Sequence, residues 1–335
     1  MTIEIKIMLV ALVAVLLIAA FILAGAYVCY RLAFSVPARP DGKLPDIPET
    51  EQYAPYRNEI IKMSLEAQEM PYEEVYVTSY DGLSLFGRCY IVSRGAPWVI
   101  MFHGYRSVAY FECGCGLKFA VDSGYNVLLV DQRAHGKSQG KCLTFGIKES
   151  IDCRTWVDYV ISRAGSNVKI VLFGISMGGT TVLMAAERNL PKNVRAIVSD
   201  CAFSSPSDVV KKVIKDNNFP SGTYPLLRLG GLIFGGVDVG KGSAVTAMEK
   251  CDIPVLIFHG EDDRFIPCEM GRAIFEHCRS PKKEMLTVPD AGHCMSFFVN
   301  RLGYYNKLKN FIFRDVLQGD LQSFNEKSVS NGIAK

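Results

Sequence analysis

The stretch Gly174-Ile175-Ser176-Met177-Gly178-Gly179 decides the fold of this chain. An apolar run, 168–173, precedes it and a helix-forming stretch, 180–188, follows it. The pattern therefore predicts a strand, a tight turn centred on Ser176 and a helix. Glycines two residues before and two residues after the serine remove the Cβ atoms that would clash in such a turn. The serine hydroxyl would then project from the edge of a sheet, as in the G-x-S-x-G nucleophile elbow.

The same turn predicts an anion site beside Ser176. The N-terminus of the following helix carries positive potential, and the backbone N–H of Met177 would point to where an oxyanion forms. A serine alcohol is a weak nucleophile at neutral pH, so it needs a histidine base and a carboxylate that orients the histidine. The rest of the chain must supply these two groups.

His293 is the favoured base among the five histidines. It follows the last predicted strand, where the carboxyl edge of a parallel sheet would hold it beside the serine. His103 ends an early strand in Phe102-His103-Gly104-Tyr105, and its loop is expected to supply a second oxyanion donor, the N–H of Tyr105. Structural roles are expected for the other three histidines, His135, His259 and His277.

Three consecutive acids offer candidates for the carboxylate. They lie after a strand, in His259-Gly260-Glu261-Asp262-Asp263-Arg264-Phe265-Ile266-Pro267. Only one of them can meet the histidine, and the others would cap helices or pair with Arg264. Asp200, at the end of the strand after the elbow helix, is a rival for the same role. The residues alone leave these alternatives open.

Strand and helix patterns alternate from residue 72 onward. A hairpin with its turn at Asp81-Gly82 comes first. The apolar runs that follow are separated by helical segments, which predicts a mostly parallel twisted sheet with helices on both faces. These runs cover residues 98–102, 126–130, 169–173, 196–199, 255–258 and 285–288. Residues 206–250 interrupt the rhythm and are expected to form a small lid insertion over an apolar pocket, or else to pack as ordinary core.

Residues 1–34 are predicted to form a transmembrane anchor. Residues 7–28 carry no charge and are nearly all aliphatic, which exceeds the roughly 20 residues that a helix needs to cross a bilayer. A cleaved signal peptide is the alternative, because Ala24-Gly25-Ala26 resembles a cleavage site. More basic residues follow the run than precede it, which weakly favours a catalytic domain on the cytoplasmic face of the cell membrane. A chain that begins near Ser35 is expected to be soluble and active.

The remaining boundaries follow from composition. The proline-rich residues 35–71 are predicted to form a spacer and a short helix, residues 72–317 one catalytic domain, and residues 318–335 a polar tail. With 335 residues, of which 49% are hydrophobic, the chain can bury one large core. A net charge of +3 without a basic block gives no reason to expect a nucleic-acid partner. Nothing in the sequence indicates the oligomeric state.

Eleven cysteines in a chain of this size are expected to be mostly reduced and buried. Cys113 and Cys115 lack a second pair of ligands at zinc spacing, so no metal site is expected there or elsewhere. Serine-based acyl transfer needs no organic cofactor, and none is expected.

These motifs resemble the α/β-hydrolase superfamily over roughly residues 72–315. The chain is most similar to bacterial, often membrane-anchored hydrolases of the prolyl-oligopeptidase-like and dienelactone-hydrolase-like groups, which include serine aminopeptidase-type enzymes. The family pattern H-G-x-x-D-x-x-V-P places its acid on Asp263, with Ile266 in the valine position. The resemblance thus implies a triad of Ser176, Asp263 and His293 in the family order, and it assigns no chemistry to the block 131–138.

The motifs and the resemblance together imply a serine hydrolase that cleaves carboxylic esters through an acyl-enzyme. A peptidase acting on short peptides is the alternative, because the resembling groups include serine peptidases with the same machinery. A non-catalytic binding protein on the same fold is a third hypothesis. The fold cannot choose between a small-molecule ester and a short peptide as substrate.

Overall fold

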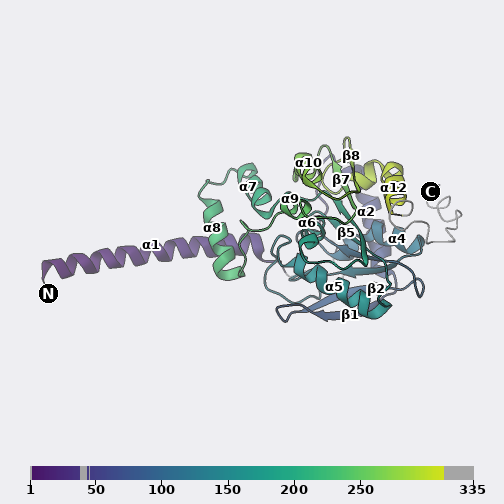
Figure 1. Cartoon of the computed structure of the whole chain (residues 1–335). Helices are drawn as coiled ribbons and strands as arrows, with labels where there is room; N and C mark the ends of the chain where they lie inside the picture. The colour runs from purple at the N-terminus through teal and green to yellow at the C-terminus, as the bar shows by residue number, and fades with distance from the viewer. Residues whose placement is uncertain (1, 38–43, 45, 313–335) are drawn as a thin grey trace.

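An eight-stranded sheet forms the centre of the molecule (Figure 1), in a computed structural model that describes residues 2–37, 44 and 46–312. The strand order is β1-β2-β4-β3-β5-β6-β7-β8. β2 pairs antiparallel with β1 and with β4, and the other neighbours are parallel. The strands are β1 (Glu73–Thr78), β2 (Ser84–Tyr90), β3 (Trp98–Phe102), β4 (Asn126–Val130), β5 (Ile170–Ile175), β6 (Val194–Asp200), β7 (Val255–Gly260) and β8 (Lys283–Val288).

The mostly parallel sheet confirms the fold predicted from the apolar runs. β3 and β4 have the predicted bounds, and the other parallel strands extend beyond the predicted runs by one or two residues at an end, although β5 begins one residue later than predicted. β6 continues to Asp200 because it pairs with β5 on one side and β7 on the other as far as that residue. The predicted polar tail, 318–335, lies outside the described residues, as does part of the predicted spacer.

Helices cover both faces of the sheet. Side chains of successive strand residues point to opposite faces, so Ile100 joins one core cluster and Val99 the other. On the first face lie α5 (Glu149–Ala164), α6 (Met177–Met184), α9 (Ala244–Met248) and α10 (Cys268–His277). On the second lie α2 (Arg57–Glu69), α3 (Ala109–Glu112), α4 (Gly114–Asp122) and α12 (Arg301–Lys309). The short helix α11 (Ser296–Val299) precedes α12.

The helix α1 (Ile3–Phe34) projects from the body of the molecule (Figure 1). Its most apolar 18-residue window has a mean hydropathy of 3.3 and no buried residue. At about 1.5 Å per residue the helix is about 48 Å long, whereas the hydrocarbon core of a bilayer is about 30 Å thick. Its length and composition suit a membrane span, and a signal sequence shares both properties.

The segment 206–250 divides into two parts. Its last helix, α9, packs into the core. Its first part consists of α7 (Pro206–Asp216), α8 (Thr223–Gly230) and a π-helical turn (Gly231–Gly235), and in Figure 1 α8 crosses α1 away from the sheet.

The C-terminal part of α1 packs against α8 and the π-helical turn. Three buried residues spaced four apart, Ala26, Tyr30 and Phe34, form the contact stripe on α1. The approach is close: a Cβ atom on Gly230 would lie 2.2 Å from the carbonyl oxygen of Ala26, so only glycine fits there. The ring of Phe234 lies 5.1 Å from that of Tyr27, centroid to centroid. The C-terminal part of the predicted anchor therefore packs against the catalytic domain, whereas the rest of the helix projects from it.

Candidate active site

Ser176 lies at the sharp turn between β5 and α6, as the glycine spacing predicts. Its backbone has φ 54° and ψ −118°, in a region that residues other than glycine rarely adopt. A Cβ on Gly174 would lie 2.1 Å from the carbonyl oxygen of Gly178, and a Cβ on Gly178 would lie 2.1 Å from that of Phe102. Both glycines are therefore required by close backbone contacts, and the turn holds the serine in a fixed position.

The structure brings Ser176, His293 and Asp263 together in one hydrogen-bonded row. The serine Oγ lies 2.9 Å from Nε2 of His293, and Nδ1 of the same ring lies 2.7 Å from Oδ2 of Asp263. Asp263 is 4% exposed, and its Oδ1 accepts hydrogen bonds from the backbone N–H groups of Phe265 at 3.0 Å and Ile266 at 2.7 Å. Because the carboxylate is fixed at both oxygens, it holds the Nδ1–H tautomer, which leaves Nε2 to accept the serine proton.

The other two candidate acids lie in different surroundings. Asp262 is exposed, one position before Asp263. Asp200 is buried, burial raises its pKa well above the usual range, and its Oδ1 has no hydrogen-bond partner among the described residues. Neither side chain is hydrogen-bonded to His293 in the described part of the chain. Of the alternatives that the residues left open, the geometry favours Asp263.

The predicted oxyanion donors lie on two segments next to Ser176. Met177 is the first residue of α6, and Tyr105 lies in the loop after β3. Among the described residues, neither backbone N–H donates a hydrogen bond, which leaves both for a ligand. The phenol of Tyr105 points away and donates to the carbonyl oxygen of Ala33 in α1 at 2.9 Å.

Glu112 at the end of α3 was not predicted from the sequence. It accepts a hydrogen bond from the backbone N–H of Gly104, so it fixes the loop that carries Tyr105. Burial raises the pKa of its carboxyl to about 7. A single glutamate in a helix carries no motif, and only the folding of α3 against the loop after β3 gives it this position.

His135, which was expected to be structural, and His103 hold the loops after β3 and β4 together. Nε2 of His135 accepts the backbone N–H of Arg106 at 3.1 Å, and Nε2 of His103 accepts that of Gln132 at 3.1 Å. His259 lies beside the predicted acid, with its Nε2 2.9 Å from the carbonyl oxygen of Ile266. His277 is exposed on α10, with its Nδ1 2.8 Å from the carbonyl oxygen of Ala273.

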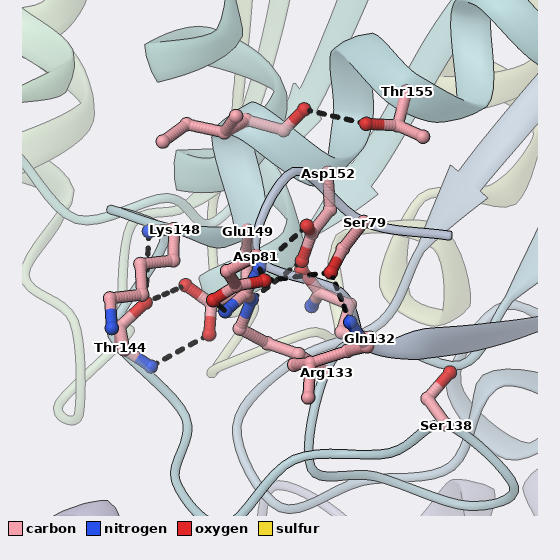
Figure 2. Close-up of polar contacts among 12 residues, drawn as sticks. Ser79, Asp81, Gln132, Arg133, Ser138, Thr144, Lys148, Glu149, Asp152 and Thr155 are labelled. Carbon is pink, nitrogen blue, oxygen red and sulfur yellow. Dashed lines mark hydrogen bonds and ion pairs between the residues drawn. The ribbon is translucent and has the colours of Figure 1, made fainter. Parts of the chain in front are cut away.

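The block 131–138 forms a loop held by an ion-pair network around the buried side chain of Arg133. Figure 2 shows Arg133 between Asp81 and Asp152. The guanidinium is bonded through Nη1 to Asp81 at 2.9 Å and through Nε to Asp152 at 2.6 Å, and its side chain is only 3% exposed. Gln132 in the same loop accepts a hydrogen bond from Thr181 of α6 at 3.1 Å. The loop thus connects the hairpin with the elbow helix.

The predicted spacer residues also reach the site, which the sequence did not indicate. The hydroxyl of Tyr53 donates to the backbone carbonyl of His293 at 2.8 Å. A cavity of about 390 Å³ lies between this segment and the loop after β3, and its lining includes Tyr53, Tyr105, Glu112, His293 and Cys294. A second hollow of about 750 Å³ is lined by residues 48–53, Arg264, Phe265 and His293. Residues 48–53 therefore form a wall of the site.

Comparison with known proteins gives one family and several relatives. The family described as "alpha/beta hydrolase fold" matches residues 97–229. An uncharacterized protein, YqkD of Bacillus subtilis, is 28% identical over 196 residues, which are 57% of this chain and 63% of YqkD. The uncharacterized protein YfhR of Salmonella typhi is 28% identical over 258 residues, 72% of this chain and 81% of YfhR.

Solved structures show the same fold. The Pyrococcus furiosus esterase Pf2001 superposes with a TM-score of 0.60 at 22% identity, over 81% of this chain and 98% of the esterase. At this identity the likeness establishes the fold and leaves the substrate open. The match with YqkD, the first of the curated relatives, spans less than two thirds of that protein's length.

Proposed function

Because the chain belongs to the α/β-hydrolase superfamily, we propose that it is a serine hydrolase that cleaves carboxylic esters through an acyl-enzyme. The observation that carries this proposal is the unbroken row of hydrogen bonds from Asp263 through His293 to Ser176. A binding module needs no such row. The esterase likeness of the fold is consistent with the same reaction class.

The mechanism follows from the positions of these groups. Ser176 attacks the ester carbonyl while Nε2 of His293 takes its proton, and the N–H groups of Tyr105 and Met177 stabilise the oxyanion. His293 then gives the proton to the leaving alcohol, which departs and leaves an acyl group on the serine. A water molecule, activated by the same nitrogen, releases the acid and restores the serine. Asp263 stays ionised throughout and stabilises the imidazolium.

A fluorophosphonate probe tests the proposal directly. The probe should label the folded protein at Ser176, because only an activated serine reacts with it at a useful rate. Ser176→Ala should abolish labelling, whereas Ser162→Ala, at an exposed serine of α5, should leave it unchanged. Folded protein that remains unlabelled would support the binding-protein hypothesis. A panel of nitrophenyl esters and aminoacyl anilides then separates an esterase from a short-peptide hydrolase.

We also propose that α1 anchors the enzyme in the membrane and supports the active-site loop. Besides the Tyr105 contact, Arg106 donates from Nε to the carbonyl oxygen of Ser35 at 3.0 Å and from Nη2 to that of Leu32 at 2.6 Å. Ala26, the last residue of the alternative signal-peptide cleavage site, is buried against α8. These contacts favour an uncleaved helix.

Full-length protein should remain in the membrane fraction through a carbonate wash. The structure changes the expectation for a truncated chain beginning at Ser35: it should be less active than the full chain, because Tyr105 loses its acceptor in α1 and α8 loses its packing partner. Ester hydrolysis by both proteins in the same detergent, together with their thermal unfolding, measures this effect. A mature chain beginning near Tyr27 would establish cleavage, and full activity in the truncated chain would show that the contacts with α1 are dispensable.

The lid segment, residues 206–235, is proposed to meet the lipid surface beside α1. Leu232, Ile233 and Phe234 are 47%, 50% and 39% exposed, which does not suit ordinary core packing. They lie next to Ala26 and Tyr27 of α1, near the end of the predicted membrane span, and so extend the apolar surface of that helix. An apolar surface in this position can bind the acyl region of a bilayer.

Replacing Leu232 and Phe234 together with serine should therefore lower hydrolysis of long-chain esters presented in vesicles more than hydrolysis of short soluble esters. The ratio of the two rates is the measurement. Leu302→Ser, at a 58%-exposed residue of α12, is the matched control and should not change the ratio. If the double variant unfolded more easily but kept the same ratio of long-chain to short-chain hydrolysis, Leu232 and Phe234 would instead be ordinary core residues.

A further inference from the structure

Two cysteines lie beside the predicted catalytic histidine. Cys201 follows the last residue of β6, and Cys294 follows His293. Their sulfur atoms are 3.4 Å apart, and the two sulfurs and a ring nitrogen of His293 all lie within 4.8 Å of one another. Both cysteines have positive φ angles, 46° and 61°, which cysteine rarely adopts. Tertiary structure alone brings these donors together, since 93 residues separate the two cysteines.

Two thiolates and an imidazole form a donor set that zinc prefers. In a tetrahedral site with Zn–S bonds of about 2.3 Å, two sulfurs lie about 3.8 Å apart. The observed separation therefore needs to open by only a few tenths of an ångström. Carboxyl groups surround the cluster: Asp263 is bonded to His293, and Asp200 precedes Cys201 in the chain. The negative charge of Asp263 favours a cation at this position, whereas burial raises the pKa of Asp200 and so favours its neutral form.

We propose that Cys201, Cys294 and His293 form an inhibitory binding site for Zn²⁺, with water as the fourth ligand. The ion can reach the site through the cavity of about 390 Å³, because His293 and Cys294 both line it. Two of the three ligands are thus accessible from the space where substrate would enter. Cys201 lies behind them, fully buried, and closes the site.

Zinc at this site is incompatible with catalysis whichever ring nitrogen binds it. Nε2 of His293 is the atom that takes the proton from Ser176, and Nδ1 is the atom that Asp263 holds. Coordination through Nε2 would keep the carboxylate on Nδ1, as in the carboxylate–histidine–zinc arrangement of many metal sites. The inhibition rests on the proposed function, whereas the binding of the metal does not.

Binding is tested with Co²⁺, which replaces zinc in tetrahedral thiolate sites and absorbs light there. Full-length protein in detergent, kept reduced, should develop a thiolate-to-cobalt charge-transfer band that Zn²⁺ removes. Ser176→Ala should retain the band, because the serine is not a ligand. Cys201→Ser and Cys294→Ser should each lose it, while Cys142→Ser, at a half-buried cysteine near the lid, should keep it. Absence of the band, or a band that survives both ligand variants, overturns the proposal.

Inhibition is tested on the same proteins with a nitrophenyl ester. Zn²⁺ should stop hydrolysis and a chelator should restore it, and Cys294→Ser should need at least about tenfold more zinc for the same inhibition. Equal zinc sensitivity of Cys294→Ser and the wild type would overturn the assignment. If the wild type hydrolyses no ester and binds no fluorophosphonate but shows the cobalt band, the metal site stands and the proposed function fails.

Discussion

Ser176→Ala and His293→Ala should each lower ester turnover by several powers of ten, on the order of 10⁴-fold or more. The serine provides the atom that is acylated, and the histidine is hydrogen-bonded to it at 2.9 Å, so neither can act without the other. The double variant should be scarcely worse than either single variant, because the two groups work as one unit. Steady-state rates on one nitrophenyl ester measure the losses.

The control for these variants is their folding. Circular dichroism and thermal unfolding should match the wild type, because Ser176→Ala removes a single oxygen atom and the ring of His293 borders an open cavity and belongs to no described core cluster. Ser162→Ala on α5 should retain full activity. If Ser176→Ala kept more than about a hundredth of the wild-type rate, the elbow serine would not be the nucleophile.

Asp263→Asn should cost on the order of 10⁴-fold in turnover. The serine-protease case described for the equivalent substitution gives this magnitude, because the amide keeps the shape but favours the wrong imidazole tautomer. In this chain the carboxylate accepts from Nδ1 at 2.7 Å and is held by the N–H groups of Phe265 and Ile266. An asparagine NH₂ group cannot accept a hydrogen bond from Nδ1–H. The imidazole ring would therefore rotate, or its proton would move from Nδ1 to Nε2.

Two matched substitutions make this test specific. Asp262→Asn changes an exposed neighbour in the same loop, and Asp200→Asn changes the buried acid at the end of β6. Both should cost far less than Asp263→Asn. If Asp200→Asn abolished turnover and Asp263→Asn lowered it only slightly, Asp200 would be the acid of the triad. Ser176 and His293 would keep their proposed roles.

Local sequence determined the sheet and the elbow. Five-residue apolar runs at 98–102 and 126–130 are too short for a typical helix and are typical of buried strands, and these are the observed bounds of β3 and β4. Gly174 and Gly178 mark a turn in which the backbone of β5, α6 and the end of β3 come within contact distance. These features depend on a few neighbouring residues and on hydrophobic period, so they could be predicted without knowledge of the rest of the chain.

Tertiary structure decided everything that depends on distant segments. It placed Asp263 and not Asp262 or Asp200 against His293, since the side-chain direction depends on how the loop after β7 folds. It brought Glu112 to the loop after β3, laid Tyr53 across the backbone of His293, and joined Tyr105 to the end of α1. None of these contacts has a periodic or local pattern, because each joins segments whose proximity depends on the packing of the whole domain. The sequence by itself thus determined the framework and the candidate nucleophile and base, and its family resemblance indicated Asp263 as the acid. Only the packed chain decided which walls and which cysteines surround them.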